Sequence, residues 1–122
     1  MKVLFDEGVP EALAECLPGH EVSTVKRQGW RSIKNGKLLD LIESTGFEAF
    51  LTNDKRIVFE QPLRNRPFAT LILSVSNWNI IRERVTAIAS ALDEAQPGMV
   101  TKVDCGTFVP KRFRKPEDPG LA

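Results

Sequence analysis

Short apolar runs and amphipathic stretches alternate along the first part of the chain. Residues 2–5, KVLF, form an apolar run that ends at two acids, and Pro10 then opens a stretch whose apolar residues have helical spacing. Val22 and Val25 lie among polar residues in HEVSTV, a pattern typical of a half-buried strand over 20–25. The chain therefore begins with a predicted strand, an acidic turn, a helix and a second strand.

One helix and two strands are predicted in the middle of the chain. Asn35 can cap a helix that runs through LLDLIEST and ends at Gly46. The apolar runs FEAFLT over 47–52 and FATLIL over 68–73 predict a third and a fourth strand, and the fourth is apolar enough to be buried on both faces. Between them, IVFEQPL predicts a short helix or a loop, because proline ends regular structure there.

The clearest helical pattern covers residues 78–95, where apolar residues recur at helical spacing. Ser76 or Asn77 is its predicted N-cap, and the Pro-Gly pair that follows ends it. Residues 99–103 then predict a strand at the edge of the sheet. The periodicity stops at residue 104, and three prolines flank the basic segment KRFRK from there on, which predicts an extended tail over 104–122.

This alternation of strands and helices predicts the α/β class of fold. Strands joined through helices pair in parallel with right-handed crossovers, so we expect a three-layer α/β/α sandwich around a mainly parallel sheet of four to five strands. Residues 1–103 are predicted to form this domain. A chain of 122 residues is long enough to bury one core without a disulfide or a structural metal.

Charge and composition narrow the classes of partner. Lys and Arg total 17 and Asp and Glu total 16, a net charge of +1, so a uniformly basic nucleic-acid coat is excluded. Any nucleic-acid site must come from local segregation of charge. Residues 26–37 carry five cations and no acid, and we interpret them as a solvated basic loop. Trp30 within this loop either stacks on a base or anchors the loop to the domain.

The sequence does not predict a zinc site, a catalytic histidine, a signal peptide or a membrane-spanning segment. Cys16 and Cys105 lie far apart, and with a single histidine the chain lacks the Cys/His spacing of a zinc site. His20 follows Pro-Gly and is interpreted as a turn residue rather than a catalytic base. The first apolar run is too short for a signal peptide and no run is long enough for a membrane span, so we expect a soluble cytoplasmic protein.

Polar residues gather where the predicted strands end. Ligands of open parallel sheets bind past the carboxyl ends of the strands. The first, third and fourth strands bring to this edge Asp6, Glu7, Asp54, Arg56 and Ser74. Carboxylates without histidine or cysteine are ligands that Mg²⁺ or Mn²⁺ prefers, and nearby cations favour an anionic substrate. The pattern predicts metal-assisted phosphodiester hydrolysis. Turn chemistry is the alternative, because Asp is also common in turns after strands.

Two motifs, LFDEGVP over 4–10 and LTNDK over 51–55, resemble those of the short PIN-like domains, and the order and spacing of the elements from Met1 to about Val103 fit the same family. The resemblance implies a PIN-like sandwich and a metal-dependent ribonuclease that uses Mg²⁺ or Mn²⁺ to hydrolyse RNA. It also implies the toxin component of a bacterial toxin-antitoxin pair, with an antitoxin protein as partner. We further expect a homodimer.

The resemblance assigns roles to individual residues. Asp6 matches the first acid of the family and Asp54 the acid after the third strand, so both are predicted to be catalytic and to ligate the metal. Asn35 stands where the family often has another acid and is the third predicted metal ligand. RNA phosphates are predicted to contact Lys34, Lys37 and Arg56. Support around the metal site is predicted for Ser74 and for Glu7, with surface or capping duty as the alternative for Glu7.

Two further departures from the family pattern leave alternatives open. Arg56 stands where the family often has a second acid, and Gly8 where it usually has Asn. Asn35 and Arg56 favour a PIN-like module that has lost catalysis and binds nucleic acid or protein. Another alternative is a homo-oligomeric interaction protein that uses the apolar parts of 57–68 and its tail. Asp40 and Glu43 are interpreted as the solvated face of their helix.

Overall fold

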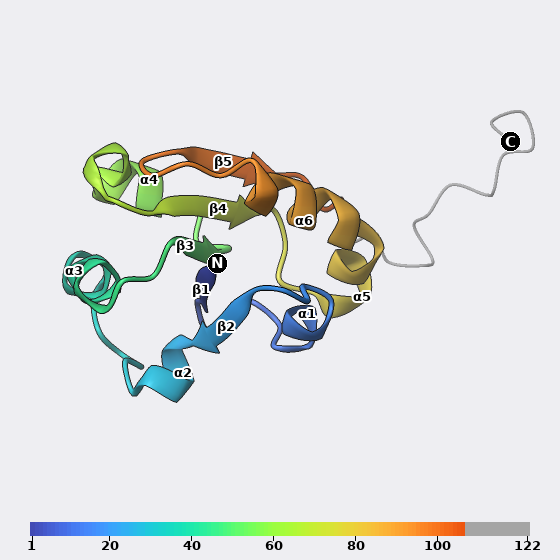
Figure 1. Ribbon diagram of the computed structural model, residues 1–122, viewed down its shortest axis with the longest axis horizontal. Helices are drawn as coiled ribbons and strands as arrows, with labels where there is room; N and C mark the ends of the chain where they lie inside the picture. Colours follow the sequence, from blue (N-terminus) through green and yellow to red (C-terminus); the bar gives the residue numbers. More distant parts are fainter. Residues whose placement is uncertain (107–122) are drawn as a thin grey trace, which may run out of the picture.

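The computed structural model of the chain describes residues 1–106, so most of the predicted tail over 104–122 lies outside the described residues. Strands and helices alternate along the chain (Figure 1). The strands are Lys2–Phe5 (β1), Glu21–Thr24 (β2), Ala49–Thr52 (β3), Ala69–Leu73 (β4) and Val100–Val103 (β5). The α-helices are Ala12–Glu15 (α1), Val25–Gln28 (α2), Asn35–Thr45 (α3), Ile57–Glu60 (α4), Trp78–Ile81 (α5) and Val85–Asp93 (α6). Two 3₁₀ turns are Leu63–Asn65 (η1) and Arg82–Arg84 (η2).

The five strands form one sheet in the order β2-β1-β3-β4-β5, and every neighbouring pair is parallel. The predicted mainly parallel α/β fold is therefore confirmed. All five residues of β4 are buried, as the apolar run predicted, and β5 is the predicted edge strand. Because the strands are parallel, their carboxyl ends all lie at the same edge of the sheet.

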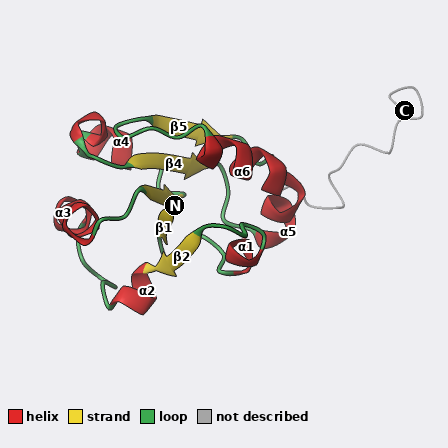
Figure 2. Ribbon diagram, viewed as in Figure 1, coloured by secondary structure: helices red, strands yellow, loops and turns green. Residues whose placement is uncertain are grey.

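Two apolar clusters fill the two faces of the sheet. Alternate residues of a strand point to opposite faces, so Val3 and Phe5 join one cluster and Leu4 the other. Residues of α1, α5 and α6 pack in the first cluster, and residues of α3 and α4 in the second. Figure 2 shows these two groups of helices on opposite sides of the strands. The arrangement is the expected three-layer sandwich.

The basic stretch over 26–37 is not wholly a loop, because α2 occupies its first residues. Thr24 caps this helix: its Oγ1 accepts a hydrogen bond from the backbone N–H of Arg27 at 3.0 Å. Gly29 ends the helix in the left-handed region at φ 76°. A Thr cap and a Gly stop only five residues apart are sufficient for a single turn, which is too short to produce a periodic pattern.

The helix predicted over 78–95 is divided into α5, η2 and α6. Asn77 is the cap, since its Oδ1 accepts a hydrogen bond from the backbone N–H of Asn79 at 2.8 Å. The backbone of Arg84 departs from helical values at φ −123° and ψ 19°. The three residues of η2 are exposed, so no core contact opposes the tighter turn there.

The packed body continues past β5. Cys105 is buried, and its backbone N–H donates to Ser74 Oγ at 2.8 Å. Cys105 therefore packs with the domain, two residues past the predicted boundary at 103. Within residues 1–106, no helix has both the length and the apolar character needed to cross a membrane.

Candidate active site

Asp6 and Asp54 lie at the carboxyl ends of two neighbouring strands. Asp6 directly follows β1, and its backbone N–H donates to Leu51 O of β3 at 2.9 Å. Asp54 follows β3 by two residues. In the order β2-β1-β3-β4-β5, the chain passes from β1 to β2 on one side and from β3 to β4 on the other, so the strand order reverses between β1 and β3. The two predicted acids follow the two strands at this reversal, and each lines a separate surface hollow.

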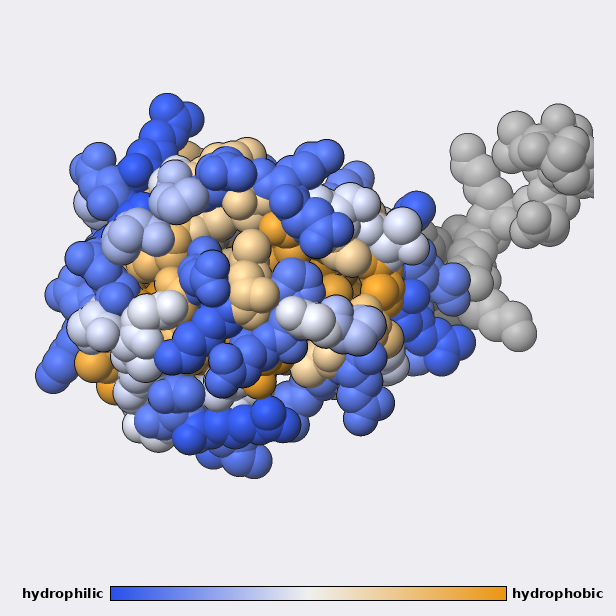
Figure 3. Space-filling model, viewed as in Figure 1, coloured by the Kyte–Doolittle hydropathy of each residue, from blue (hydrophilic) through white to orange (hydrophobic). Residues whose placement is uncertain are grey.

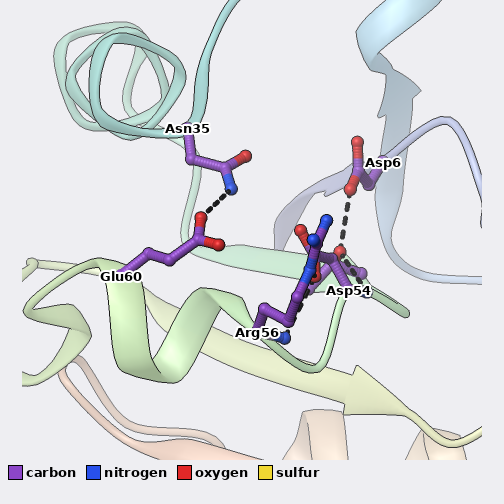
Figure 4. A network of polar contacts seen from close by, with 6 residues as sticks. Asp6, Asn35, Asp54, Arg56 and Glu60 are labelled. Carbon is purple, nitrogen blue, oxygen red and sulfur yellow. Dashed lines mark hydrogen bonds and ion pairs between the residues drawn. The ribbon is translucent and has the colours of Figure 1, made fainter.

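Thr52 connects the two acids. Its hydroxyl is buried at the end of β3, where Oγ1 donates to Asp6 Oδ2 at 2.8 Å and accepts from the backbone N–H of Asp54 at 3.0 Å. Figure 4 shows the hydrogen bond accepted by the Asp6 carboxylate as a dashed line. The sequence analysis quoted Thr52 within a motif but gave it no role. The sequence feature that could have indicated a role for Thr52 is its position: it is a hydroxyl residue at the end of an apolar strand, two residues before Asp54.

The hydrogen bonds of the two carboxylates leave acceptor capacity unused. Asp6 Oδ1 accepts from the backbone N–H of Glu7 at 2.9 Å, so each Asp6 oxygen has one partner. Asp54 Oδ1 accepts from the backbone N–H and from Nε of Arg56, at 3.0 and 3.5 Å. Asp54 Oδ2 has no partner among residues 1–106. Since a carboxylate offers about four lone-pair positions, both acids can still accept a cation.

Asn35 does not cap α3 as predicted. Lys34 takes the N-cap position with extended backbone, and Asn35 is the first helical residue. Its Nδ2 instead donates to Glu60 Oε2 of α4 at 3.3 Å, and Figure 4 shows the two side chains pointing toward one another. The amide nitrogen is thus engaged, while its oxygen has no partner within the described part of the chain. Sequence reasoning missed Glu60, because the contact joins residues far apart along the chain.

The donor set fits a hard cation that keeps most of its water. The described residues contain no group of three or more His, Cys, Asp or Glu side chains placed to hold a metal ion. Asp6 and Asp54 supply two carboxylates, and Mg²⁺ commonly binds proteins through one or two carboxylates while it retains several waters. The residues that would hold such an ion are therefore Asp6 and Asp54, with the oxygen of Asn35 as a weaker neutral donor.

The predicted phosphate contacts differ in their surroundings. Arg56 is exposed over 80% of its side chain and forms its ion pair with Asp54. Lys34 and Lys37 lie at the start of α3 and are exposed to solvent. Of the three cations, only Arg56 contacts one of the two acids in the described residues.

The two predicted supporting residues make other contacts. Glu7 is exposed, and its Oε1 lies 3.7 Å from Nε of Arg31, so its side chain faces the basic segment after β2. The hydroxyl of Ser74 accepts from the backbone N–H of Cys105 and lies 3.5 Å from Gly106 O. Neither side chain hydrogen-bonds to Asp6 or Asp54. Ser74 does share a surface hollow of about 350 Å³ with Asp54 and Arg56.

Gly8 and Asn53 tie together the turns that carry the acids. Asn53 Nδ2 donates to Gly8 O at 2.6 Å, between the turn after β1 and the turn after β3. A Cβ atom on Gly8 would overlap the Asn53 side chain. Position 8 therefore requires glycine as long as Asn53 keeps this place, because the Asn53 amide fills the space that a side chain at position 8 would occupy.

Three other residues considered from the sequence lie outside this group. Trp30 packs edge-on against Phe47 with ring centroids 6.1 Å apart, so it anchors the basic segment to the domain. His20 precedes β2 and lies at the opposite edge of the sheet, with Nδ1 3.2 Å from the N-terminal amine. Asp40 lies on the exposed face of α3, as predicted.

The acids of α3 form an ion-pair cluster of their own. Arg66 Nη1 lies 2.6 Å from Asp40 Oδ1 and 3.3 Å from Glu43 Oε1. The hydrogen bond with Asp40 raises the pKa of Arg66 above its ordinary value, and burial opposes this rise. The cluster joins α3 to the segment before β4. It is separate from the Asp6–Asp54 pair, so Asp40 and Glu43 add no carboxylate to that pair.

Comparisons of the chain with protein-family models, with curated proteins and with solved structures found no match. The PIN-like resemblance of the LFDEGVP and LTNDK motifs therefore stays a prediction.

Proposed function

We propose that this protein is a metal-dependent ribonuclease whose centre is the Asp6–Asp54 pair. The observation that carries the proposal is the Thr52 bridge, in which one buried hydroxyl fixes Asp6 and the backbone of Asp54 at the ends of adjacent parallel strands. A structural turn needs no such link between two separate acids. The reversal of strand order between β1 and β3 is also the place where open parallel sheets bind ligands.

Each residue has a defined part in the proposed reaction. Asp6 and Asp54 hold Mg²⁺ or Mn²⁺ with the free oxygen positions described above. The ion, when bound, neutralises charge on the scissile phosphate and activates a water molecule for hydrolysis. Arg56 is exposed and lies at the edge of the pair, so its guanidinium can turn from Asp54 to a phosphate oxygen. Lys34 and Lys37 hold the backbone of the RNA.

The proposed biological setting follows from the motif resemblance. A nuclease that cleaves cellular RNA needs control, and the proposed role as the toxin of a toxin-antitoxin pair supplies this control through an antitoxin protein. RNA is the proposed substrate. The mixed charge of the surface around the acids favours a short stretch of RNA rather than a long electrostatic footprint.

The proposal is tested with Asp6→Asn and Asp54→Asn, because Asn keeps the shape and the hydrogen-bond acceptor of each side chain but removes its charge. We expect Mn²⁺ binding in a calorimetric titration to weaken at least about tenfold in each variant, since a hard cation needs anionic ligands. Metal-dependent cleavage of a mixed RNA pool should stop in both variants and in wild type with a chelator. Asp93→Asn, an exposed aspartate of α6, is the matched control and should keep both properties. Unchanged cleavage in both site variants would contradict the proposal.

A second candidate is a binding module without catalysis. The ion pair of Arg56 with Asp54 favours this candidate, because the guanidinium of Arg56 contacts one carboxylate oxygen that a metal ion would use. This candidate predicts RNA binding that weakens with salt and persists in a chelator, without turnover. A filter-binding series in increasing KCl, with and without EDTA, separates the two functions.

A further inference from the structure

Among residues 1–106, no strand lies beside the outer edge of β5. Met99 O and Val103 O accept from the backbone N–H groups of Thr70 and Ser74, so these carbonyls point toward β4. In a parallel strand the backbone groups alternate in direction, and those of Val100 and Lys102 therefore point away from the sheet. Within residues 1–106, no group hydrogen-bonds to them. Figure 1 shows β5 at the margin of the sheet with α4 close to it.

A surface hollow lies next to this open edge. It has a volume of about 810 Å³ between α4, η1 and β5, and its apolar lining includes Val58, Phe59, Leu63 and Val100. A smaller hollow of about 230 Å³ shares Phe59 and continues toward the end of β5. The side chain of Val100 faces the hollow while its backbone faces the open edge. A chain added to the edge would therefore also cover the hollow.

Phe59 is the most exposed large apolar side chain among residues 1–106, at 86% of its surface. A single exposed apolar residue is ordinary on a protein surface. Phe59 differs because it lines both hollows and stands beside unpaired strand groups. Apolar surface shows between hydrophilic side chains on the face seen in Figure 3. The combination of an aromatic side chain, a hollow and an open strand edge is the arrangement used to bind extended peptides.

The charged side chains around the two hollows indicate which kind of partner can bind there. Lys55, Arg64 and Lys102 line them, and in the described part of the chain none of the three has a carboxylate within ion-pair distance. Asp104 is the one acid that lines either hollow among these residues. A second copy of the chain would bring like cations together, which disfavours a dimer through this edge. An acidic partner would neutralise them.

We propose that the edge of β5 and the adjoining hollow bind an extended, acidic peptide segment of a partner protein. The segment adds a sixth strand through the backbone of Val100 and Lys102. Its apolar side chains at alternate positions enter the hollow against Phe59, and its carboxylates meet Lys55, Arg64 and Lys102. The proposal is independent of the ribonuclease activity, because none of these residues belongs to the Asp6–Asp54 pair.

The first test uses a fluorescein-labelled peptide in which glutamate alternates with valine or leucine, and a second peptide with lysine in place of each glutamate. Fluorescence anisotropy with the full chain should show at least about tenfold tighter binding of the acidic peptide. Phe59→Ala and Lys102→Glu should each weaken its binding about tenfold, as expected for central contacts of an interface. Arg27→Glu, an exposed cation of α2, is the control and should change binding less than about twofold.

The second test uses wild-type protein and N-methylated forms of the acidic peptide. Methyl groups on every second backbone nitrogen remove either the N–H groups that face β5 or those that face solvent. One of the two methylated peptides should bind about tenfold more weakly than the other, because an added strand uses alternate backbone groups. Equal affinities of the two, binding that ignores Phe59→Ala, or no binding of the acidic peptide would overturn the proposal. A loss of single-stranded RNA affinity in Phe59→Ala without peptide binding would assign the surface to nucleic acid and overturn it too.

Discussion

At the scale of single residues, the candidate site depends on one hydroxyl. Thr52 is fully buried and makes two hydrogen bonds, one to the Asp6 carboxylate and one from the Asp54 backbone. The first bond orients a charged side chain, and the second fixes the turn that carries the other acid. Both acids could be predicted from the sequence, since Asp6 directly follows one apolar run and Asp54 lies two residues after another. The hydrogen bond from Thr52 to Asp6 could not be predicted, because it requires β1 and β3 to be neighbours.

Replacing Thr52 by Val tests this bridge, since Val has nearly the same shape but no hydroxyl. We expect the free energy of unfolding to fall by about 1 kcal/mol, because the Asp54 N–H and one Asp6 oxygen lose their partner in a partly buried position. Mn²⁺ affinity should fall about tenfold, because the two carboxylates are less well oriented. Urea denaturation and calorimetry measure the two effects. Thr52→Ser keeps the hydroxyl and should retain most of the metal affinity; equal loss in both variants would show that the hydroxyl has no such role.

At the scale of elements, most hydrophobic patterns predicted the correct type of secondary structure, and a few predicted elements with the wrong bounds. Strands β1, β3 and β4 follow their apolar runs, and α3 ends at Gly46 as predicted. The basic segment contains α2, which local capping forms without a periodic pattern. Asn35 is the first helical residue and not the cap, and its side-chain nitrogen donates to Glu60 of α4. These differences all concern polar side chains, whose partners are chosen by the surrounding structure.

Thr24→Ala tests the cap of α2. The variant loses the Oγ1 acceptor for the backbone N–H of Arg27, and we expect the free energy of unfolding to fall by about 1 kcal/mol. Thr24→Ser retains the acceptor and should lie within a few tenths of a kcal/mol of wild type. Urea denaturation followed by circular dichroism measures both. If Ser and Ala destabilise the protein equally, the contribution of Thr24 is packing of its methyl group and not the cap.

At the scale of the whole molecule, the buried Cys105 thiol links stability to pH. Burial raises the pKa of Cys105 above its ordinary value, although hydrogen bonding with Ser74 opposes the rise. The unfolded chain therefore releases this proton at lower pH than the folded protein. The thiol's contribution to stability is complete below the unfolded pKa of about 8.5 and is lost as the pH rises through the folded pKa.

We therefore expect the free energy of unfolding to decrease above about pH 8.5 more steeply in wild type than in Cys105→Ala. Urea denaturation at a series of pH values gives the slopes. The absolute stability of the variant will be lower at every pH because of the lost packing, so the comparison concerns the slope alone. Cys16→Ala, which changes a partly exposed thiol, is the control. Parallel slopes for wild type and Cys105→Ala would contradict the expectation.

The sequence by itself determined the class of fold and the two acids of the candidate site. Apolar periodicity is a local property, because a strand or helix buries one face whatever it packs against. Alternation of strands and helices then limits the sheet to parallel pairing. Asp6 and Asp54 could be placed at one edge from this information alone, since the carboxyl ends of parallel strands share an edge.

Only the tertiary structure decided which polar groups meet. The Thr52 bridge, the pairing of Asn35 with Glu60 and the fit of Asn53 to Gly8 each join segments far apart in the chain. The open edge of β5 beside Phe59 likewise depends on the order of the strands. Hydrogen bonds between side chains require partners within about 3 Å, and no local pattern of residues fixes distances between separate elements. The strand order and the packing of the helices set those distances.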